Sequence, residues 1–181
     1  MRPISSPRII CAKPSPSALL GGEEGNGFYQ LMEQLPQERL ALAIGAVAAM
    51  ERAIDLTVDY AKQREAFGQP IWQHQSVGNY LADMATKLEA ARQLTRYAAR
   101  RYDSGERADM EAGMAKLFAS ETAMEIALNA VRIHGGYGYS TEFDVERYFR
   151  DAPLMIVGEG TNEIQRNVIT RQLIKRYPVS S

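Results

Sequence analysis

Apolar residues recur three and four positions apart from Phe28 onward, which is the period of an amphipathic α-helix. The first such set predicts a helix that ends near Arg64, with an apolar face formed by Leu40, Ile44, Val47, Ile54 and Val58. Pro36 predicts a kink or a restart near its beginning, because proline lacks the amide proton that a helix interior uses. Almost no segment alternates as a strand does, so we expect an all-α fold.

Two further long helices are predicted by the same spacing. The apolar face of the second consists of Val77, Leu81, Met84, Leu88 and Ala91, and Ser104-Gly105 ends this helix. Asp109 is expected to cap the third, whose apolar face consists of Met114, Leu117, Met124, Leu128 and Val131 and which Gly135-Gly136 ends. Each face must be buried against another helix.

Two shorter helices complete the pattern. Thr141, with Asp144 three residues on, resembles a capping box and predicts a short helix up to Ala152. Thr161 is expected to cap a last helix over residues 162–177. Long amphipathic helices with short connections predict an antiparallel, up-down four-helix bundle with a short extra helix.

The first residues differ in composition from the rest. Residues 1–22 contain Pro3, Pro7, Pro14 and Pro16 and no Asp or Glu. Because these prolines oppose a helix, we expect a disordered tail over residues 1–22 and a helical bundle over residues 23–181. The basic, acid-free tail makes an organelle matrix the weaker alternative to a cytoplasmic location.

Charge and cysteine content exclude several classes of function. The 181 residues include 21 Lys and Arg against 22 Asp and Glu, a formal net charge of −1. We therefore expect neither nucleic acid nor membrane as a partner, because both attract basic proteins. Cys11 is the only cysteine and cannot form an internal disulfide, which favours the cytoplasm.

The two histidines do not have the spacing of a metal site. A di-iron bundle places a Glu three residues before each ligating His. These positions hold Ile71 before His74 and Val131 before His134, so no metal is expected. Nor does the chain contain a Walker or Rossmann glycine pattern.

A carboxylate between two glycines is the remaining candidate for chemistry. Glu159 lies between Gly158 and Gly160, directly before a predicted helix start. Glycines give this backbone unusual freedom and let a ligand approach closely. A polar loop whose acid favours the positive end of the helix dipole is the simpler interpretation of the same residues.

Four blocks of residues, in a fixed order, carry a resemblance to a known family. They are residues 27–40, Arg64-Glu65-Ala66-Phe67-Gly68 with Gln75, His134-Gly135-Gly136-Tyr137-Gly138-Tyr139 followed by residues 146–152, and Glu159-Gly160-Thr161. Together they resemble the C-terminal helical domain of the acyl-CoA dehydrogenases, a family of flavoenzymes. The similarity runs from about Leu19 to Tyr177.

The resemblance implies a reaction, which is oxidation of an acyl-CoA thioester with FAD as the hydride acceptor. Glu159 matches the family's base, which removes the α-proton. A burial-raised pKa would suit this task. Some branches carry the base at the position that matches Glu38 instead, and this chain has both carboxylates. Glu159 is the first choice, because branches that use the helix carboxylate generally replace the loop carboxylate.

The resemblance also implies binding residues. Those expected to contact FAD are Arg64, Phe67, Gln75, Gly135, Gly136, Thr161 and Glu163, with Arg64 and Phe67 reaching the FAD of a neighbouring subunit. Arg132 stands where the family often has Gln and would replace an amide contact with a phosphate contact. Arg39 and Gly160 match positions at the substrate.

Full-length members have an N-terminal helical domain and a middle β-domain that do not match any part of this sequence. We therefore expect activity only with a complementary chain carrying these domains, and weak FAD binding by the chain alone. A non-catalytic helical assembly module and an inactive truncated remnant are the alternatives. The family also implies an acyl-CoA substrate, an electron-transfer acceptor and a homo-oligomer, either a dimer or a tetramer.

Overall fold

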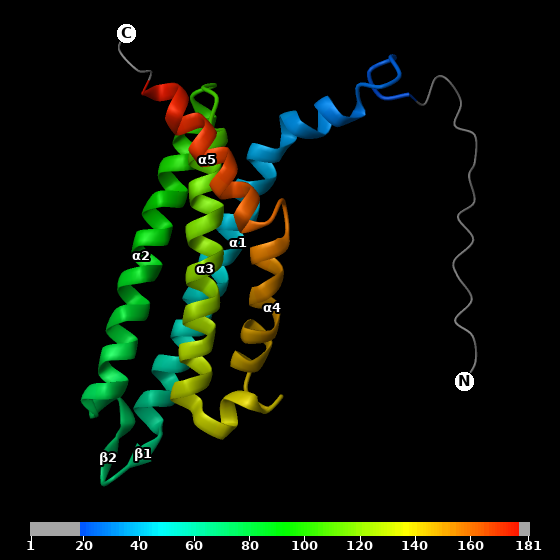
Figure 1. Cartoon of the computed structure of the whole chain (residues 1–181). Helices are drawn as coiled ribbons and strands as arrows, with labels where there is room; N and C mark the ends of the chain where they lie inside the picture. Colours follow the sequence, from blue (N-terminus) through cyan, green and yellow to red (C-terminus); the bar gives the residue numbers. More distant parts are fainter. Residues whose placement is uncertain (1–18, 178–181) are drawn as a thin grey trace, which may run out of the picture. The chain divides into compact units, whose positions relative to one another are not determined.

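A computed structural model describes residues 19–177, and the larger part of the expected tail lies outside this range. In this range the chain forms five α-helices, two short strands and short 3₁₀ turns (Figure 1). The helices are α1 (Gly27–Gln63), α2 (Gln75–Asp103), α3 (Asp109–His134), α4 (Val145–Val157) and α5 (Asn162–Arg176), and the strands are β1 (Glu65–Ala66) and β2 (Gln69–Pro70). The all-α prediction is confirmed.

The described residues divide into two compact units, which meet between Gln34 and Leu35. In the first unit, Gln30 at the start of α1 donates a hydrogen bond from Nε2 to the carbonyl of Leu20, at 3.1 Å. The rings of Phe28 and Tyr29 meet edge to face. The second unit contains the helical bundle and all the predicted site residues.

Within the second unit, α3 is the central helix. α2, α4 and α5 all pack against it, and the part of α1 from Leu35 onward adds residues to the same core. Figure 1 shows α1, α2, α3 and α4 running in alternating directions, as the short connections predict. None of the helices over residues 19–177 combines the length and the apolarity that a membrane span requires.

The core faces of α1 and α3 are built mostly from small residues, and the predicted apolar faces were only partly right. On α1, Leu40 is buried as predicted and Val47 and Ile54 pack against the core. On α1 the innermost residues are Leu40, Ala43, Ala46, Met50, Ala53, Thr57 and Ala61, whereas Ile44 is 54% exposed. On α3 the predicted Met114, Leu117, Met124, Leu128 and Val131 are half-buried, and the fully buried face consists of Ala112, Ala115, Ala119, Ala123, Ile126 and Ala130. Alanines let the axes of neighbouring helices approach closely. The larger side chains therefore pack beside the line of closest approach between helices rather than on it.

Glycines end the helices where the sequence predicts. Gly105 and Gly135 both have positive φ, at 74° and 62°, the conformation that glycine adopts readily after a helix. Two capping predictions were wrong, because Ala108 precedes α3 where Asp109 was expected, and α4 begins after Asp144 rather than Thr141. Thr161 does occupy the residue before α5, although its side chain makes no capping hydrogen bond.

The observed helices differ from the predicted ones at two further points. Pro36 lies inside α1, which continues through it without a restart. α4 reaches Val157, beyond the expected end at Ala152, so only a short turn separates it from α5.

A small hairpin follows α1 and fixes the Arg64 segment. β1 and β2 pair antiparallel through a turn of Phe67 and Gly68, both with positive φ as a type I′ turn requires. The His74 ring contacts the hairpin, with Nε2 3.0 Å from the carbonyl oxygen of Ala66. The amide of Ile71 donates to the carbonyl of Arg64 at 2.8 Å.

Candidate functional site

The structure separates the predicted site residues into two groups. One group, which we call the Glu159 cluster, contains Glu38, Arg39, Glu159, Gly160, Thr161 and Glu163. The other surrounds a cavity beside Arg64, near the hairpin. Glu38 lies on α1 and Arg64 directly follows it, so they are about 39 Å apart along the helix at a rise of roughly 1.5 Å per residue.

The turn that carries Glu159 joins α4 to α5. Glu159 has a φ of 51°, in the left-handed region that a residue with a Cβ rarely adopts, and Gly160 follows with a φ of 82°. The amide of Gly158 continues the end of α4 by donating to the carbonyl of Leu154, at 2.8 Å. The turn therefore reverses the backbone sharply and leaves the Glu159 side chain exposed.

Glu38 and Glu159, the two alternative bases, lie together. Their carboxyl groups lie beside each other, although 121 positions of sequence separate them. The neighbouring Glu38 carboxyl group raises the pKa of Glu159, and partial burial acts in the same direction. Arg39 and Lys116 oppose the rise.

Arg39 lies beneath this pair, in the core. Its side chain is buried, and burial lowers its pKa while the charges of Asp109 and Glu159 favour the cation. Among residues 19–177, Nε of Arg39 has no hydrogen-bond partner although it is shielded from solvent. An unpaired buried donor beside a carboxylate suits contact with a polar ligand atom.

The start of α5 completes the Glu159 cluster. Gly160 has no room for a side chain without a shift, since a Cβ there would approach Nε2 of Gln165 to 3.1 Å. Glu163 is exposed in the first turn of α5. A hydrogen bond from its own amide lowers its pKa, and the Thr161 hydroxyl adds to this effect. Thr161 and Glu163 thus form a polar edge at the helix N-terminus.

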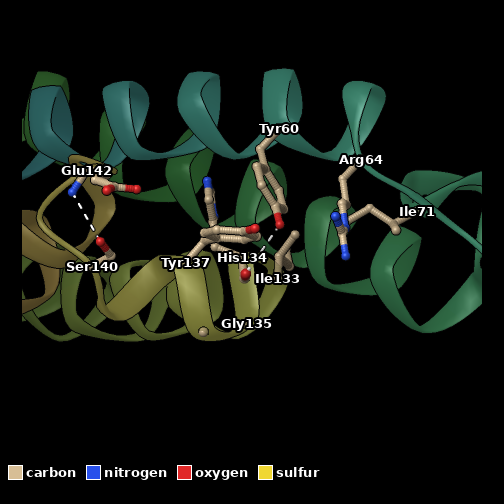
Figure 2. Close-up of a pocket in the computed structure, with 10 residues that line it drawn as sticks. Tyr60, Arg64, Ile71, Ile133, His134, Gly135, Tyr137, Ser140 and Glu142 are labelled. Carbon is tan, nitrogen blue, oxygen red and sulfur yellow. Dashed lines mark hydrogen bonds between the residues drawn. The ribbon is translucent and has the colours of Figure 1, made fainter.

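The second group surrounds a cavity of about 540 Å³ between the end of α1 and the end of α3 (Figure 2). Its lining consists of Tyr60, Arg64, Ile71, Ile133, His134, Gly135, Gly136, Tyr137, Ser140 and Glu142. Figure 2 shows Arg64 and Glu142 at opposite ends of the lining. The cavity therefore has a cationic end, an anionic end and aromatic rings between them.

His134 forms part of the wall and stays neutral. Its ring stacks on Tyr60, with ring centres 4.1 Å apart, and Nδ1 lies 2.8 Å from the carbonyl of Ala130. Burial lowers the pKa of His134, more than the contact with Ala130 raises it. The positive charge at this cavity thus comes from Arg64.

Three predicted cofactor residues lie outside the lining of this cavity. Phe67 is 98% exposed at the tip of the hairpin. Gln75 is exposed as the first residue of α2. Arg132 is exposed in the last turn of α3 and donates to Oδ1 of Asn129, at 3.1 Å. A ligand that touched all of these residues would extend beyond the cavity along the surface.

Several residues of both groups were not predicted. Lys116, Asn162 and Gln165 are buried beneath the Glu159 turn, and Tyr60, Tyr137 and Glu142 line the Arg64 cavity. For Lys116 a signal existed in the sequence, since residues 112, 116, 119 and 123 recur at helical spacing and all but Lys116 are alanine. A lysine on such a face is buried and must have partners.

Comparison with known proteins identifies the class. Residues 25–174 match the family model "Acyl-CoA dehydrogenase, C-terminal domain". The chain belongs to the acyl-CoA dehydrogenase family and carries its C-terminal helical domain. The resemblance inferred from the sequence motifs is confirmed.

Individual relatives show what share of a full-length family member this chain covers. An acyl-CoA dehydrogenase of Bacillus subtilis is 48% identical over 159 residues, which cover 88% of this chain and 42% of that protein. The crystal structure of acyl-CoA dehydrogenase from Geobacillus kaustophilus superposes with a TM-score of 0.82 at 43% identity, over 84% of this chain and 40% of that one. The FAD complex of PigA superposes with a TM-score of 0.80 at 33% identity, over 86% of this chain and 41% of that one. The chain thus spans about two fifths of the relatives that it matches.

Proposed function

We propose that this chain supplies the C-terminal domain of an FAD-dependent acyl-CoA dehydrogenase, with Glu159 as the base that removes the α-proton of the acyl thioester. FAD, when bound, accepts the β-hydride, and an electron-transfer protein then reoxidises it. The remaining chemistry falls to the residues of this chain. They must hold a carboxylate at the α-carbon and bind the cofactor's polar part.

The closeness of the Glu38 and Glu159 carboxyl groups is the observation that carries the assignment of the base. A base works best when its pKa is near the operating pH, and the neighbouring Glu38 carboxyl raises the pKa of Glu159 in that direction. In this arrangement Glu159 takes the substrate proton, and Glu38 raises the pKa of Glu159. The buried Arg39 lies close enough for its charge to limit the rise.

The Arg64 cavity supports binding of the dinucleotide part of FAD. Within residues 19–177 no carboxylate forms a salt bridge with Arg64, so its guanidinium is free to pair with a pyrophosphate oxygen. A Cβ added at Gly135 or Gly136 would meet no atom within 4 Å, so the backbone there is open to a ligand. These residues fit the cofactor, with Phe67, Gln75 and Arg132 as further contacts.

The separation of the two groups supports a homo-oligomer. Thr161 and Glu163 accompany Glu159 at one end of α1, whereas Arg64 follows its other end, so one cofactor cannot bridge both groups of a single copy. Each cofactor would contact the Glu159 cluster of one copy and the Arg64 cavity of a neighbour. A dimer or a tetramer provides such neighbours.

Complementation with the part of a relative that lies outside the matched region tests the proposal. The 181-residue chain is titrated with FAD alone and then with the remaining N-terminal part of the Bacillus subtilis relative, produced separately. We expect weak flavin binding by the chain alone, and dye reduction with saturated acyl-CoA thioesters by the mixture. Glu159→Gln should reduce the rate by about 10²- to 10⁴-fold and Glu38→Gln far less.

The opposite ranking of the two variants would make Glu38 the base. A mixture that binds flavin and acyl-CoA but does not reduce dye would overturn the catalytic proposal. Stoichiometric flavin in the purified chain alone would contradict the expected weak binding.

A helical assembly module is the second candidate function. Large apolar side chains are exposed on several elements, including Phe67 at 98%, Leu154 at 70% and Val157 at 56%. Such residues are typical of interfaces between chains. The size of the purified chain in solution, measured by sedimentation, tests this candidate. We propose the cytoplasm as the compartment for either function.

A further inference from the structure

The backbone of Glu159 is held in a conformation that it would not adopt by itself. Its φ of 51° is unfavourable for a residue with a Cβ, and such conformations persist only where surrounding contacts fix them. The carbonyls of Ile156, Glu159 and Gly160 all accept hydrogen bonds from buried side chains rather than from the turn itself. The source of these hydrogen bonds therefore determines where the Glu159 carboxyl group lies.

Lys116 of α3 is one source. Its side chain is fully buried, at 0% exposure. Its Nζ donates to the carbonyls of Ile156 at 2.8 Å and Gly160 at 3.0 Å, and to Oδ1 of Asn162 at 2.7 Å. An ammonium group has three protons, so these partners use all of them. The three acceptors lie before, within and after the turn.

Three acceptors around Nζ require the charged form of Lys116, because only an ammonium group has three protons to donate. Burial lowers the pKa of Lys116, and Arg39 acts in the same direction. The carboxylates of Glu163, Glu159 and Glu121 oppose this effect. Hydrogen bonds from a cation are roughly twice as strong as neutral ones. A charged Lys116 therefore stabilises the turn more than a neutral donor would.

α5 holds the same turn from the other side. Gln165 is fully buried and donates from Nε2 to the carbonyls of Glu159 at 3.1 Å and Gly160 at 2.9 Å. Asn162 is fixed in turn by Ser120 of α3, whose Oγ accepts from Nδ2 of Asn162 at 3.0 Å. The Gly160 carbonyl thus lies between a donor from α3 and a donor from α5.

We propose that Lys116 is a positioning residue, whose buried ammonium clamps both ends of the Glu159 turn and so holds the Glu159 carboxyl group against Glu38. The importance of the clamp for catalysis rests on the proposed function. The clamp itself needs neither flavin nor substrate. It can therefore be tested on the chain alone.

The test compares the 181-residue chain with its Lys116→Met variant, which keeps the length of the side chain and removes its charge. Amide hydrogen exchange of Gly158, whose amide donates to the carbonyl of Leu154, is followed by NMR with ¹⁵N-glycine. It should be at least about tenfold faster in the variant, because the charged hydrogen bonds that hold this turn are lost. The pKa of the Glu159 carboxyl group should also fall. The loosened turn releases this group from Glu38, whose contact raises the pKa by more than the charge of Lys116 lowers it.

A matched control separates positioning from general stability. Met84 is as fully buried as Lys116 but lies on α2, so Met84→Ala should weaken the core without changing the pKa of Glu159. A chemical rescue adds a second control. Lys116→Cys in a Cys11→Ser background, aminoethylated in denaturant and refolded, regains an ammonium of similar reach and should return exchange to within about twofold of the wild type, since its hydrogen bonds are restored.

Two outcomes would overturn the inference. One is unchanged exchange and unchanged Glu159 pKa in Lys116→Met, and the other is a pKa shift of equal size in Met84→Ala. If Lys116→Met does not fold, Asn162→Ala removes one acceptor and should accelerate exchange at Gly158 to a smaller degree, with no acceleration counting against the clamp. Loss of the proposed function would appear separately, as full dye-reducing activity in the complemented Glu159→Gln chain.

Discussion

The carboxyl group of Glu38 on α1 lies beside the carboxyl group of Glu159 in the turn between α4 and α5. Two carboxyl groups in contact favour sharing one proton, because both cannot ionise without repulsion. The folded chain therefore keeps the proton of Glu159 to a higher pH than the unfolded chain does. This difference links the stability of the domain to pH.

Glu159→Gln should remove this link. Because the folded-state pKa of Glu159 is raised, its contribution to stability is full below the unfolded pKa of glutamate and is lost as pH rises through the folded pKa. The variant should therefore be more stable than the wild type at pH 8, by up to about 1 kcal/mol since solvent screens the pair. At pH 4 the two should be nearly equal. Urea denaturation at both pH values measures the difference.

Glu163→Gln is the matched control, because the pKa of Glu163 is lowered in the folded state. Its stabilising effect is present above the unfolded pKa and lost as pH falls, so this variant should be less stable than the wild type at pH 8. The same sign of change in both variants at pH 8 would contradict the assignment of opposite shifts.

Arg176→Ala should destabilise the end of the bundle. Arg176 in the last turn of α5 pairs with Glu111 of α3, whose side chain is 1% exposed and whose Oε2 has no partner among the described residues. Removing the arginine leaves the buried Glu111 carboxylate without its partner, which should lower the free energy of unfolding. Adding Glu111→Met should recover most of this loss. A double-mutant cycle by chemical denaturation that finds additive effects would exclude the pairing.

Gly138→Ala and Gly136→Ala should differ sharply. A Cβ at Gly138 would lie 2.7 Å from the carbonyl oxygen of Val131 and 3.0 Å from Cβ of His134, whereas at Gly136 no atom lies within 4 Å. Backbone must shift to admit the first methyl group, so Gly138→Ala should lower the free energy of unfolding by about 2 kcal/mol or more. Gly136→Ala should change it by under about 0.5 kcal/mol. Equal thermal stability of the two variants would contradict the packing described for the end of α3.

Arg64→Ala should weaken flavin binding by the complemented protein by about 10- to 100-fold, the effect of losing charged hydrogen bonds to a pyrophosphate. Arg64→Lys should restore binding only in part, because an ammonium cannot form the planar pair that a guanidinium forms. Fluorescence titration with FAD measures both. Arg132→Ala, which removes a cation outside the cavity lining, should have a smaller effect, and a larger one would move the phosphate contact to Arg132.

The ends of the helices could be predicted because their causes are local. Gly105 and Gly135 end α2 and α3 through a conformation that one residue determines. The core faces were harder, because Ala46 and Ile44 both fit a helical period, and only the closeness of the neighbouring helix decides which is buried. From spacing alone, the larger residue of such a pair is the one predicted to be buried.

The candidate site was predicted as separate residues rather than as contacts. The family motif identified Glu159 and Glu38 as alternatives, and nothing in their spacing indicates that they are partners. The clamp by Lys116 joins α3 to a turn about 40 residues later, a relationship that depends on the packing of α4 and α5. Such long-range contacts follow from the whole fold and not from local sequence.

The length of α1 has a genetic consequence. Under the proposed arrangement each site takes Glu159 from one copy and Arg64 from another. A copy that lacks one of these residues can therefore still contribute the other residue to a site that it shares with a different copy. Chains with Glu159→Gln and chains with Arg64→Ala would each be impaired alone. Mixed in equal amounts as a symmetric dimer, they would pair at random and reconstitute about a quarter of the sites in intact form. Two damaged alleles would then complement each other inside one protein.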